Sequence, residues 1–407
     1  MKNETYQEIE LARRSVNWGL FKTVFLALFL IGAAAFIYGI AAWDAKRAWS
    51  AYLVNYVYWT GIAFGAFLLS PILVATNATW GRPVKRVAES VAFFLPVSFV
   101  LLWPLYAGKE NVFWWVTHPE PQKAPWLNVP FFFAREGIGL LVLTGTALLF
   151  IYHSVKSDLE VAENRSAEIG HRVKSQLMLA PIFIILYAFI LSLVSFDMIM
   201  SLSPEWFSTL FGAYYFMISF YAGLSFVIIV SARMVINMGL GNLIEKKQLH
   251  DLGKLLFAFC VVSTDFFYVQ FLVIWYGNLP EETRYVIARV MSDPWTTLAW
   301  TVLLVTFVIP FFVLLFRNLK MNPLFMTFMS IWILCGVWLE KFLLVTPSML
   351  KSESVPLGFM EILITLGWLG LFGYCVCSFL SRYPTVAFSD PKLGRALEPA
   401  AEELRVI

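Results

Sequence analysis

Ionisable side chains interrupt several long apolar stretches of this sequence, and they are the residues most able to do chemistry. Six of them fall near one end of their stretches, and four different stretches carry them: Arg135, Glu136, Asp197, Glu340, Lys341 and Glu361. A charge costs at least ~2.5 kcal/mol at the centre of a bilayer, so such groups pair with one another or contact water. We therefore expect the six side chains to line one shared polar cavity that could conduct protons. The alternative is six separate residues that reach the membrane interface or form structural ion pairs.

Asp265 lies deeper, near the middle of its stretch, and Tyr268 and Gln270 follow closely. Asp265 and Tyr268 are three residues apart, so on a helix they share a face. This pattern predicts a proton relay at mid-membrane depth, and the alternative is hydrogen bonding that holds helices together. Glu89, about one helical turn into the third stretch from the opposite side, is a candidate inner entrance for protons or else an exposed carboxylate at a helix end.

Side chains that bind redox cofactors are scarce in this sequence. The four histidines lie in loops or at the ends of the apolar stretches, so no facing pair of haem b ligands is available: His118, His153, His171 and His250. The four cysteines form no CxxC pair and lack iron–sulfur or zinc spacing. No phosphate-binding loop or nucleophile motif is present. The sequence thus predicts that this chain binds no metal and no redox cofactor, and it assigns no catalytic residue.

Ten apolar stretches must position these residues. A helix needs about 20 apolar residues to cross the roughly 30 Å hydrocarbon core, and it bonds its own backbone amides. The composition agrees, because 59% of the 407 residues are hydrophobic and 14% are charged, against roughly 25% charged residues in soluble domains. We predict an all-α integral membrane protein with ten transmembrane helices at 19–42, 51–76, 87–107, 130–153, 177–200, 208–235, 254–278, 296–316, 323–345 and 356–380.

The chain divides into an N-terminal arm (1–18), a membrane domain (19–380) and a C-terminal tail (381–407). Most of the 30 Lys and Arg residues fall in the arm, the tail and the loops on their side, so the positive-inside rule predicts that both termini are cytoplasmic. The basic residues occupy short loops rather than one face, which argues against a nucleic-acid partner. On the other side, residues 279–295 predict a short interfacial helix.

Two segments carry a resemblance to a known family. Residues 195–212 read SFDMIMSLSPEWFSTLFG, and residues 268–283 read YVQFLVIWYGNLPEET. Together with the ten spans, these segments resemble the NrfD-like (polysulfide reductase membrane subunit-like) family. The similarity is greatest to the membrane subunits of alternative complex III, and among them to the smaller one, ActF.

The resemblance implies a subunit of a quinol:cytochrome c oxidoreductase, or of one with another high-potential acceptor, in a bacterial cytoplasmic (inner) membrane. It implies two four-helix bundles, spans 2–5 and 6–9, flanked by spans 1 and 10. The implied partners are a larger NrfD-like membrane subunit, an iron–sulfur subunit and multihaem c-type cytochrome subunits, with membrane lipid around them. These partners would hold the haem c groups and iron–sulfur clusters, while a quinone or quinol could contact this chain. Asp197 and Gln270 are the residues that the matching motifs carry over.

Three functions follow from these observations. The first is a membrane subunit that contributes to a quinone-site environment, proton conduction and assembly in a respiratory or photosynthetic complex. The second is a purely structural membrane anchor, in which the polar residues only join helices. The third is a stand-alone secondary transporter, which predicts inverted repeats and broken helices, and the sequence shows neither. An NrfD-type quinol site usually includes a histidine near the bundle mouth, and this chain has none at membrane depth.

Overall fold

The structure, a computed structural model, describes residues 2–163, 169–203, 205–350 and 353–397. Within these ranges the chain is helical and contains no strand, and ten helical segments are long and apolar enough to cross a membrane. The protein is therefore an all-α integral membrane protein, as predicted. The ten spans are Trp18–Trp43 (α2, Trp18–Tyr38, and η1, Gly39–Trp43), α3 (Ala45–Ala75), Arg82–Ala107 (η2 to α6), α9 (Val129–Ala162), Ile169–Leu202 (α10, Ile169–Met198, and η5, Met200–Leu202), α11 (Leu210–Met238), α12 (Lys246–Gly277), Thr296–Val313 (α14, Thr296–Leu303; η7, Leu304–Val308; α15, Ile309–Val313), α17 (Pro323–Met349) and α18 (Phe359–Arg382).

Several helices extend beyond the apolar stretches that predicted them. α9 continues to Ala162, where the sequence predicts an end at 153, and α10 begins at Ile169 rather than at 177. The extra turns carry charged residues that pair inside the protein, as Arg172 does with Glu160 at 2.8 Å. α3 begins at Ala45 because the Asp44 side chain accepts a hydrogen bond from the Arg47 amide and caps the helix. Hydropathy locates the apolar core of a helix, whereas caps and ion pairs set its ends.

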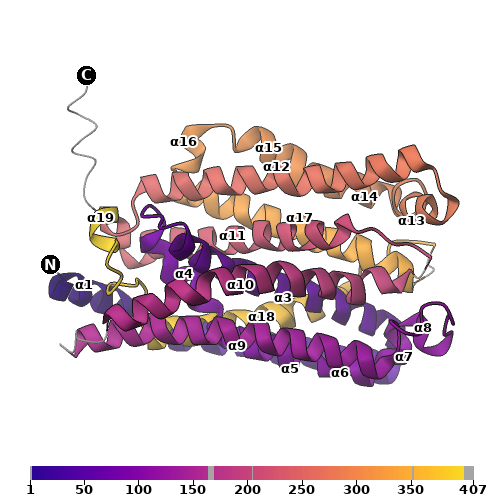
Figure 1. The fold of residues 1–407 in the computed structure, drawn as a ribbon, viewed down its shortest axis with the longest axis horizontal. Helices are drawn as coiled ribbons and strands as arrows, with labels where there is room; N and C mark the ends of the chain where they lie inside the picture. The colour runs from indigo at the N-terminus through magenta and orange to yellow at the C-terminus, as the bar shows by residue number, and fades with distance from the viewer. Residues whose placement is uncertain (1, 164–168, 204, 351–352, 398–407) are drawn as a thin grey trace.

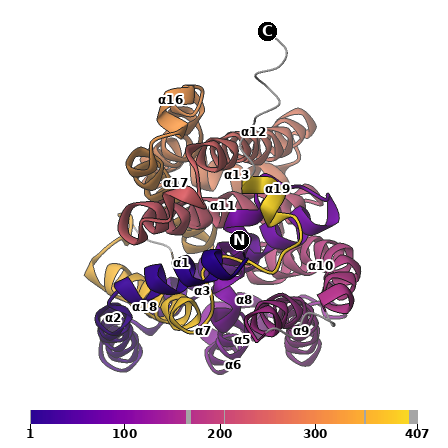
Figure 2. The same ribbon diagram turned by 90° about the vertical axis from the view of Figure 1, so that its left-hand side faces the viewer.

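The contacts between the ten spans divide them into two groups of four and one pair, and Figures 1 and 2 show the arrangement from two directions. The first group contains α3, the Arg82–Ala107 span, α9 and α10, and the second contains α11, α12, the Thr296–Val313 span and α17. α2 packs along α18, and α18 also contacts α3 and η3 (Ser90–Phe93) of the first group. This arrangement is the predicted pair of four-helix bundles, flanked by the first and tenth spans.

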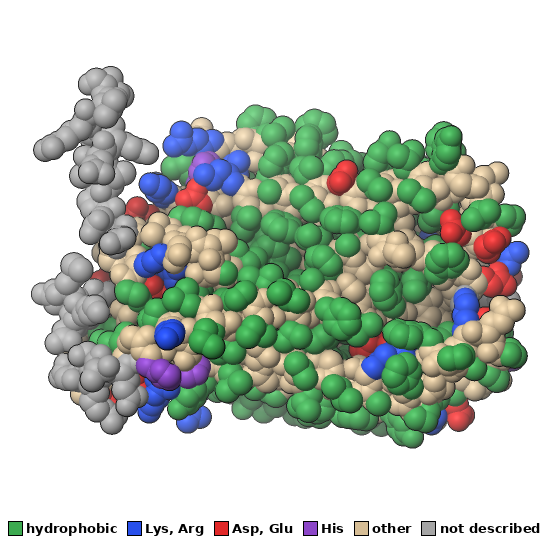
Figure 3. Space-filling model, viewed as in Figure 1, with side chains coloured by type: hydrophobic (Ala, Val, Ile, Leu, Met, Phe, Trp, Pro, Cys, Tyr) green, Lys and Arg blue, Asp and Glu red, His purple; other side chains and the backbone are tan. Residues whose placement is uncertain are grey.

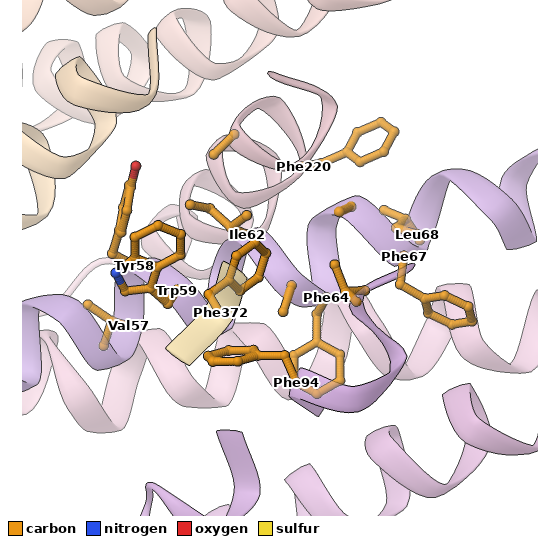
Figure 4. Close-up of a cluster of buried hydrophobic side chains, with 14 of the residues drawn as sticks. Val57, Tyr58, Trp59, Ile62, Phe64, Phe67, Leu68, Phe94, Phe220 and Phe372 are labelled. Atoms are coloured by element: carbon orange, nitrogen blue, oxygen red, sulfur yellow. The ribbon is translucent and has the colours of Figure 1, made fainter. Parts of the chain in front are cut away.

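The two bundles meet where α3 lies against α11. A Cβ atom on Gly65 would lie 2.1 Å from the Ser219 carbonyl oxygen, and one on Gly223 would lie 2.2 Å from the Ala66 nitrogen. Ser219 and Gly223 are four residues apart, so small side chains let the helix backbones touch, as in other membrane helix pairs. Figure 4 shows the buried side chains around α3, with Phe220 of α11 and Phe372 of α18 beside them. The seam is therefore tightly packed.

The described ends of the chain lie at the same end of the molecule. α1 (Lys2–Ser15) and α19 (Leu393–Leu397) are at the left of Figure 1, and we call this the α1 end. The short helices α7 (Lys109–Val112), α8 (Trp114–Thr117) and α13 (Pro280–Val290) lie at the opposite end, which we call the α13 end. α13 falls in the segment where the sequence predicts a short helix. A hydrophobic band separates the charged side chains of the two ends (Figure 3).

Candidate functional site

A cavity of about 270 Å³ lies in the second bundle toward the α13 end. Aromatic side chains supply much of its wall, among them Phe211, Phe267, Phe271, Trp300 and Phe307. Polar side chains also line it: Tyr214, Tyr221, Ser263, Thr264, Gln270, Tyr285, Arg289, Thr306 and Glu340. Apolar walls with a few convergent polar groups are typical of sites for small organic molecules, although this cavity is slightly below their usual size of about 300–1,000 Å³.

Glu340 is the carboxylate of this cavity. Tyr214 Oη donates a hydrogen bond to Glu340 Oε1 at 2.8 Å, and Lys341 Nζ donates to the same oxygen at 3.2 Å. The other oxygen, Oε2, is buried and has no hydrogen-bond partner among the described residues. A buried carboxylate oxygen without a donor is costly. Glu340 thus lines the cavity and has one carboxylate oxygen left without a hydrogen-bond donor among the described residues.

Other polar atoms on the cavity wall are also without partners in the described part of the chain. They are Ser263 Oγ, Tyr285 Oη and Arg289 Nε. Arg289 donates its hydrogen bonds to neutral groups, including the Leu344 carbonyl at 2.8 Å and Ser348 Oγ at 2.6 Å. Burial lowers the pKa of the Arg289 guanidinium and raises the pKa of the Tyr285 hydroxyl. Residues with unpaired polar atoms therefore line the cavity from two sides, α13 and the spanning helices.

The cavity lies close to the membrane-facing surface. Phe267 and Trp300 line it, yet 43% and 57% of these residues are exposed. They come from α12 and α14, the two peripheral helices of the second bundle. Next to α14, η7 is a π-helix, and the Thr306 carbonyl in it accepts a hydrogen bond from Tyr221 Oη at 3.2 Å. π-Helical turns inside longer helices occur frequently at functional sites.

The first bundle contributes an ion pair at the same end. Arg135 Nε and Nη2 contact the two Asp197 carboxylate oxygens at 2.5 and 2.7 Å. Trp126 Nε1 donates to Asp197 Oδ1 at 3.2 Å, and its ring lies 4.1 Å from the Arg135 guanidinium carbon. Both Asp197 oxygens therefore have donors, and the bidentate geometry fixes α9 against α10.

Glu136 differs from its neighbour Arg135. It is 1% exposed, and neither carboxylate oxygen has a hydrogen-bond partner among the described residues. The Lys341 ammonium of the second bundle lies 4.8 Å from the ring centre of Tyr215. The Tyr215 hydroxyl itself donates to the Val57 carbonyl at 2.7 Å. Tyr215 thus stands between the polar groups of the two bundles.

Five of the six residues of the predicted outer cluster, all except Glu361, belong to the polar groups described above. Glu361 binds Arg47 through two contacts of 2.5 and 2.9 Å and accepts a hydrogen bond from the Gly358 amide. It caps α18 and ties it to α3. No contact within the described chain links Glu361 to the other five residues.

The three residues of the predicted relay do not share a location. Gln270 lines the cavity. Asp265 and Tyr268 face outward from α12, where Tyr268 is 56% exposed. Within the described chain, Asp265 has no hydrogen bond or ion pair. The helix places Gln270 about 140° around its axis from Asp265. Gln270 therefore faces the bundle, whereas Asp265 faces outward.

Glu89 is fully buried at the α1 end rather than exposed. Arg86 contacts it at 2.5 Å, and Ser70 and Ser154 each donate to it at 2.9 Å. Arg86 also pairs with Asp158, whose second oxygen accepts from the Ser389 amide at 2.8 Å. Glu89 therefore belongs to a buried ionic network.

The tail completes this network from the membrane surface. Asp390 accepts from Arg82 at 2.9 Å and from Lys85 at 3.2 Å, and Lys85 also donates to Gln176 at 2.7 Å. Burial alone would raise the pKa of Asp390, but Lys85 and Arg82 together hold it below its usual 3.8. We call Arg82, Lys85, Arg86, Glu89, Asp158 and Asp390 the α1-end network.

Sequence reasoning missed several residues of both regions. Tyr214, Tyr215 and Arg289 resemble ordinary interfacial aromatic and basic residues in the sequence. Asp158 and Asp390 fall where the sequence predicts a loop and a tail. One available signal was the spacing of Arg86 and Glu89, which are three residues apart and so share a helix face.

Fold and site together define a ten-span membrane subunit with a polar-lined apolar cavity near its lipid-facing surface. The family model described as "Polysulphide reductase, NrfD" matches residues 44–352, about three quarters of the chain. The protein therefore belongs to the NrfD family. Comparison with curated proteins gave no match.

Proposed function

We propose that this chain is the membrane subunit of a quinol:electron-acceptor oxidoreductase complex of the alternative complex III type, related to the smaller, ActF-like subunit. Its partners would be a larger NrfD-like subunit, an iron–sulfur subunit and multihaem c-type cytochromes, which would carry the electrons. It would lie in a bacterial cytoplasmic membrane with its α1 end at the cytoplasm. The cavity of the second bundle would then face the outer half of the bilayer.

The observation that carries this proposal is the unpaired Oε2 of Glu340, a residue that lines an apolar, aromatic-walled cavity. A quinol has a flat ring that suits aromatic walls and hydroxyl groups that need acceptors. Glu340 Oε2 would accept one hydroxyl proton, and the unpaired donors of Tyr285 and Arg289 would contact the oxygen on the far side of the ring. A cavity of about 270 Å³ holds a ring, and the apolar tail of the quinol would extend between α12 and α14 into lipid.

Protons released at Glu340 need a route away from the cavity. We propose that Lys341 and Tyr215 connect Glu340 with Glu136, with water completing the gaps. Glu136 is buried without a hydrogen-bond donor, so a proton that reaches it relieves an unfavourable charge. Arg135 and Asp197 would hold the α13 end of the first bundle in position rather than carry protons. Asp265, on the outer face of α12, lies outside this route.

The decisive experiment replaces Glu340 with Gln in the assembled complex. Gln keeps the size of the side chain and removes its ability to take a proton, so we expect quinol oxidation per complex to fall at least tenfold. Glu205→Gln is a matched control, because Glu205 is an exposed carboxylate at the α13 end that pairs with Arg284 outside the cavity. Photoreactive quinone should label peptides containing Gln270 and Glu340.

A structural anchor is the competing function, and the same measurements separate it. An anchor predicts that Glu340→Gln and Asp197→Asn lower assembly or thermal stability while turnover per intact complex stays normal. Normal turnover of Glu340→Gln, together with quinone labelling confined to other subunits, would overturn our assignment of the cavity.

A further inference from the structure

The outward face of α12 carries a polar group where lipid would not tolerate one. Asp265 lies about midway between Lys254, the last basic residue of α12, and Asn278, which ends the helix. It is exposed, and no described residue pairs with it. A charged side chain at this depth is strongly unfavourable against hydrocarbon. In Figure 3 an acidic surface interrupts the hydrophobic band over α12.

Asp265 belongs to a continuous stripe along the helix. The exposed residues Val261, Asp265, Tyr268, Leu272 and Trp275 follow one another at intervals of four, three, four and three. Such intervals place side chains on one face of a helix, as in helix–helix contacts. The opposite face of α12 carries Ser263, Gln270 and Ile274, which line the cavity. The helix thus has one face committed to the cavity and a second face with no partner in the described chain.

From this stripe we infer an interface: it packs against a transmembrane helix of a different subunit, and that helix carries a Lys or Arg side chain at the depth of Asp265. The inference rests on the proposed function in that it needs a membrane partner. A basic side chain would remove the unpaired charge, and Tyr268 and Trp275 would supply broad contacts around the ion pair.

A second copy of this chain does not satisfy the stripe. In an isologous contact about a two-fold axis along the membrane normal, the same surface meets itself at the same depth, so Asp265 would lie opposite Asp265. Lys254 lies about 16 Å from Asp265 along the helix axis, since a helix rises about 1.5 Å per residue. No other Lys or Arg of α12 lies nearer. An isologous dimer therefore leaves the charge of Asp265 unmatched, which favours a partner of a different sequence.

Photo-crosslinking in the assembled complex tests the interface. A photoreactive amino acid at Leu272 should form an adduct with another membrane subunit of the purified complex. Ile185 of α10 is the control position, because it is 69% exposed among other exposed apolar side chains. The same photoreactive amino acid placed there should label lipid. Adducts of Leu272 with lipid alone, with a second copy of this chain, or with a subunit that has no Lys or Arg inside its spans would each overturn the inference.

Substitution tests the ion pair itself. Asp265→Lys should reduce retention of the crosslinked subunit at least tenfold, and changing the partner's basic residue to Asp should restore it. Asp265→Leu places an apolar side chain in the membrane and should fold. It is the substitute test if Asp265→Lys fails to insert into the membrane, and it should also reduce retention of the partner subunit. If Asp265→Leu instead leaves the complex composition unchanged, Asp265 faces lipid and the inference is wrong.

The two proposals can fail separately. If haem and iron–sulfur subunits purify with the Asp265 variants and Leu272 labels only lipid, the interface is wrong and the proposed function stands. If the wild-type chain purifies with no redox subunit at all, the proposed function itself is wrong.

Discussion

The two ends of this molecule differ in how many of their buried carboxylate oxygens accept a hydrogen bond. At the α1 end, every carboxylate oxygen of Glu89, Asp158 and Asp390 accepts a hydrogen bond. At the α13 end, Glu136 has no hydrogen-bond donor in the described chain and Glu340 has one unpaired oxygen. A network with all its acceptors filled holds helices in place. An unfilled acceptor can take up a proton, and Glu340 also belongs to the cavity wall, so the difference separates residues that hold the structure from residues that could do chemistry.

The largest expected effect comes from breaking the α1-end network. Arg86→Met leaves Glu89 and Asp158 without their shared cation, and removing one partner of a buried ion pair costs about 3–5 kcal/mol. We expect a strong fall in the melting temperature and in the yield of assembled complex. The triple variant Arg86→Met, Glu89→Gln, Asp158→Asn removes the charges together and should recover much of the loss. No recovery would mean that packing rather than charge holds this end.

The tail gives the second prediction, because Asp390 joins it to the α1-end network. Asp390→Asn weakens hydrogen bonds from Arg82 and Lys85, and bonds to charged groups contribute about 1.5–3 kcal/mol each. Residues 386–393 should then exchange their amide hydrogens faster and be cleaved sooner by protease. An equal rate in both proteins would show that the tail is held by its apolar contacts.

The pH dependence of tail docking sharpens this prediction. The pKa of Asp390 is lower in the folded protein than its usual 3.8, so its contribution is fully present above pH 3.8. The contribution is lost as the pH falls through the lowered pKa, when Asp390 takes up a proton. Wild-type protection should therefore fall in acid, whereas Asp390→Asn should show weaker protection that varies little over the same range.

These regions also differ in what the sequence could predict. Apolar length predicts all ten spans, and the shared depth of Arg135, Asp197 and Glu340 predicts that they gather at one end. Which face each residue occupies is set by helix rotation, and hydropathy contains little information on it. Asp265 and Gln270 therefore appear together in the sequence and lie on different faces of α12.

Long-range pairing is the other part that the sequence does not reveal. Asp390 binds Arg82 across 308 residues, and nothing near either residue identifies the other. The cavity depends on side chains from five segments, so it emerges only when the bundle is assembled. Whether a buried polar atom such as Glu340 Oε2 lacks a hydrogen-bond partner depends on how the helices pack. A single stretch of sequence therefore does not reveal it.

Tyr214→Phe gives a smaller effect at the cavity. It removes the 2.8 Å hydrogen bond to Glu340 Oε1 and leaves Lys341 as the only described donor. A hydrogen bond to a charged group contributes about 1.5–3 kcal/mol, and water in the cavity would offset part of it. We expect near-normal stability and a severalfold change in quinol turnover with a shifted pH profile. Tyr221→Phe, which removes a hydroxyl bound to a backbone carbonyl on the same wall, should leave that profile unchanged.

The smallest effect on stability is expected at Glu136, and it is the most direct test of the comparison. Its carboxylate is buried without a donor, so no hydrogen bond is lost when it is removed. Replacing a poorly satisfied buried polar group with an apolar one of similar shape is often neutral or stabilising. Glu136→Met should therefore keep or raise the melting temperature, whereas Arg86→Met lowers it. Proton release per quinol should nevertheless fall, because Met cannot carry a proton onward from Tyr215. A loss of stability as large as that of Arg86→Met would mean that Glu136 is a structural residue, and the contrast between the two ends would disappear.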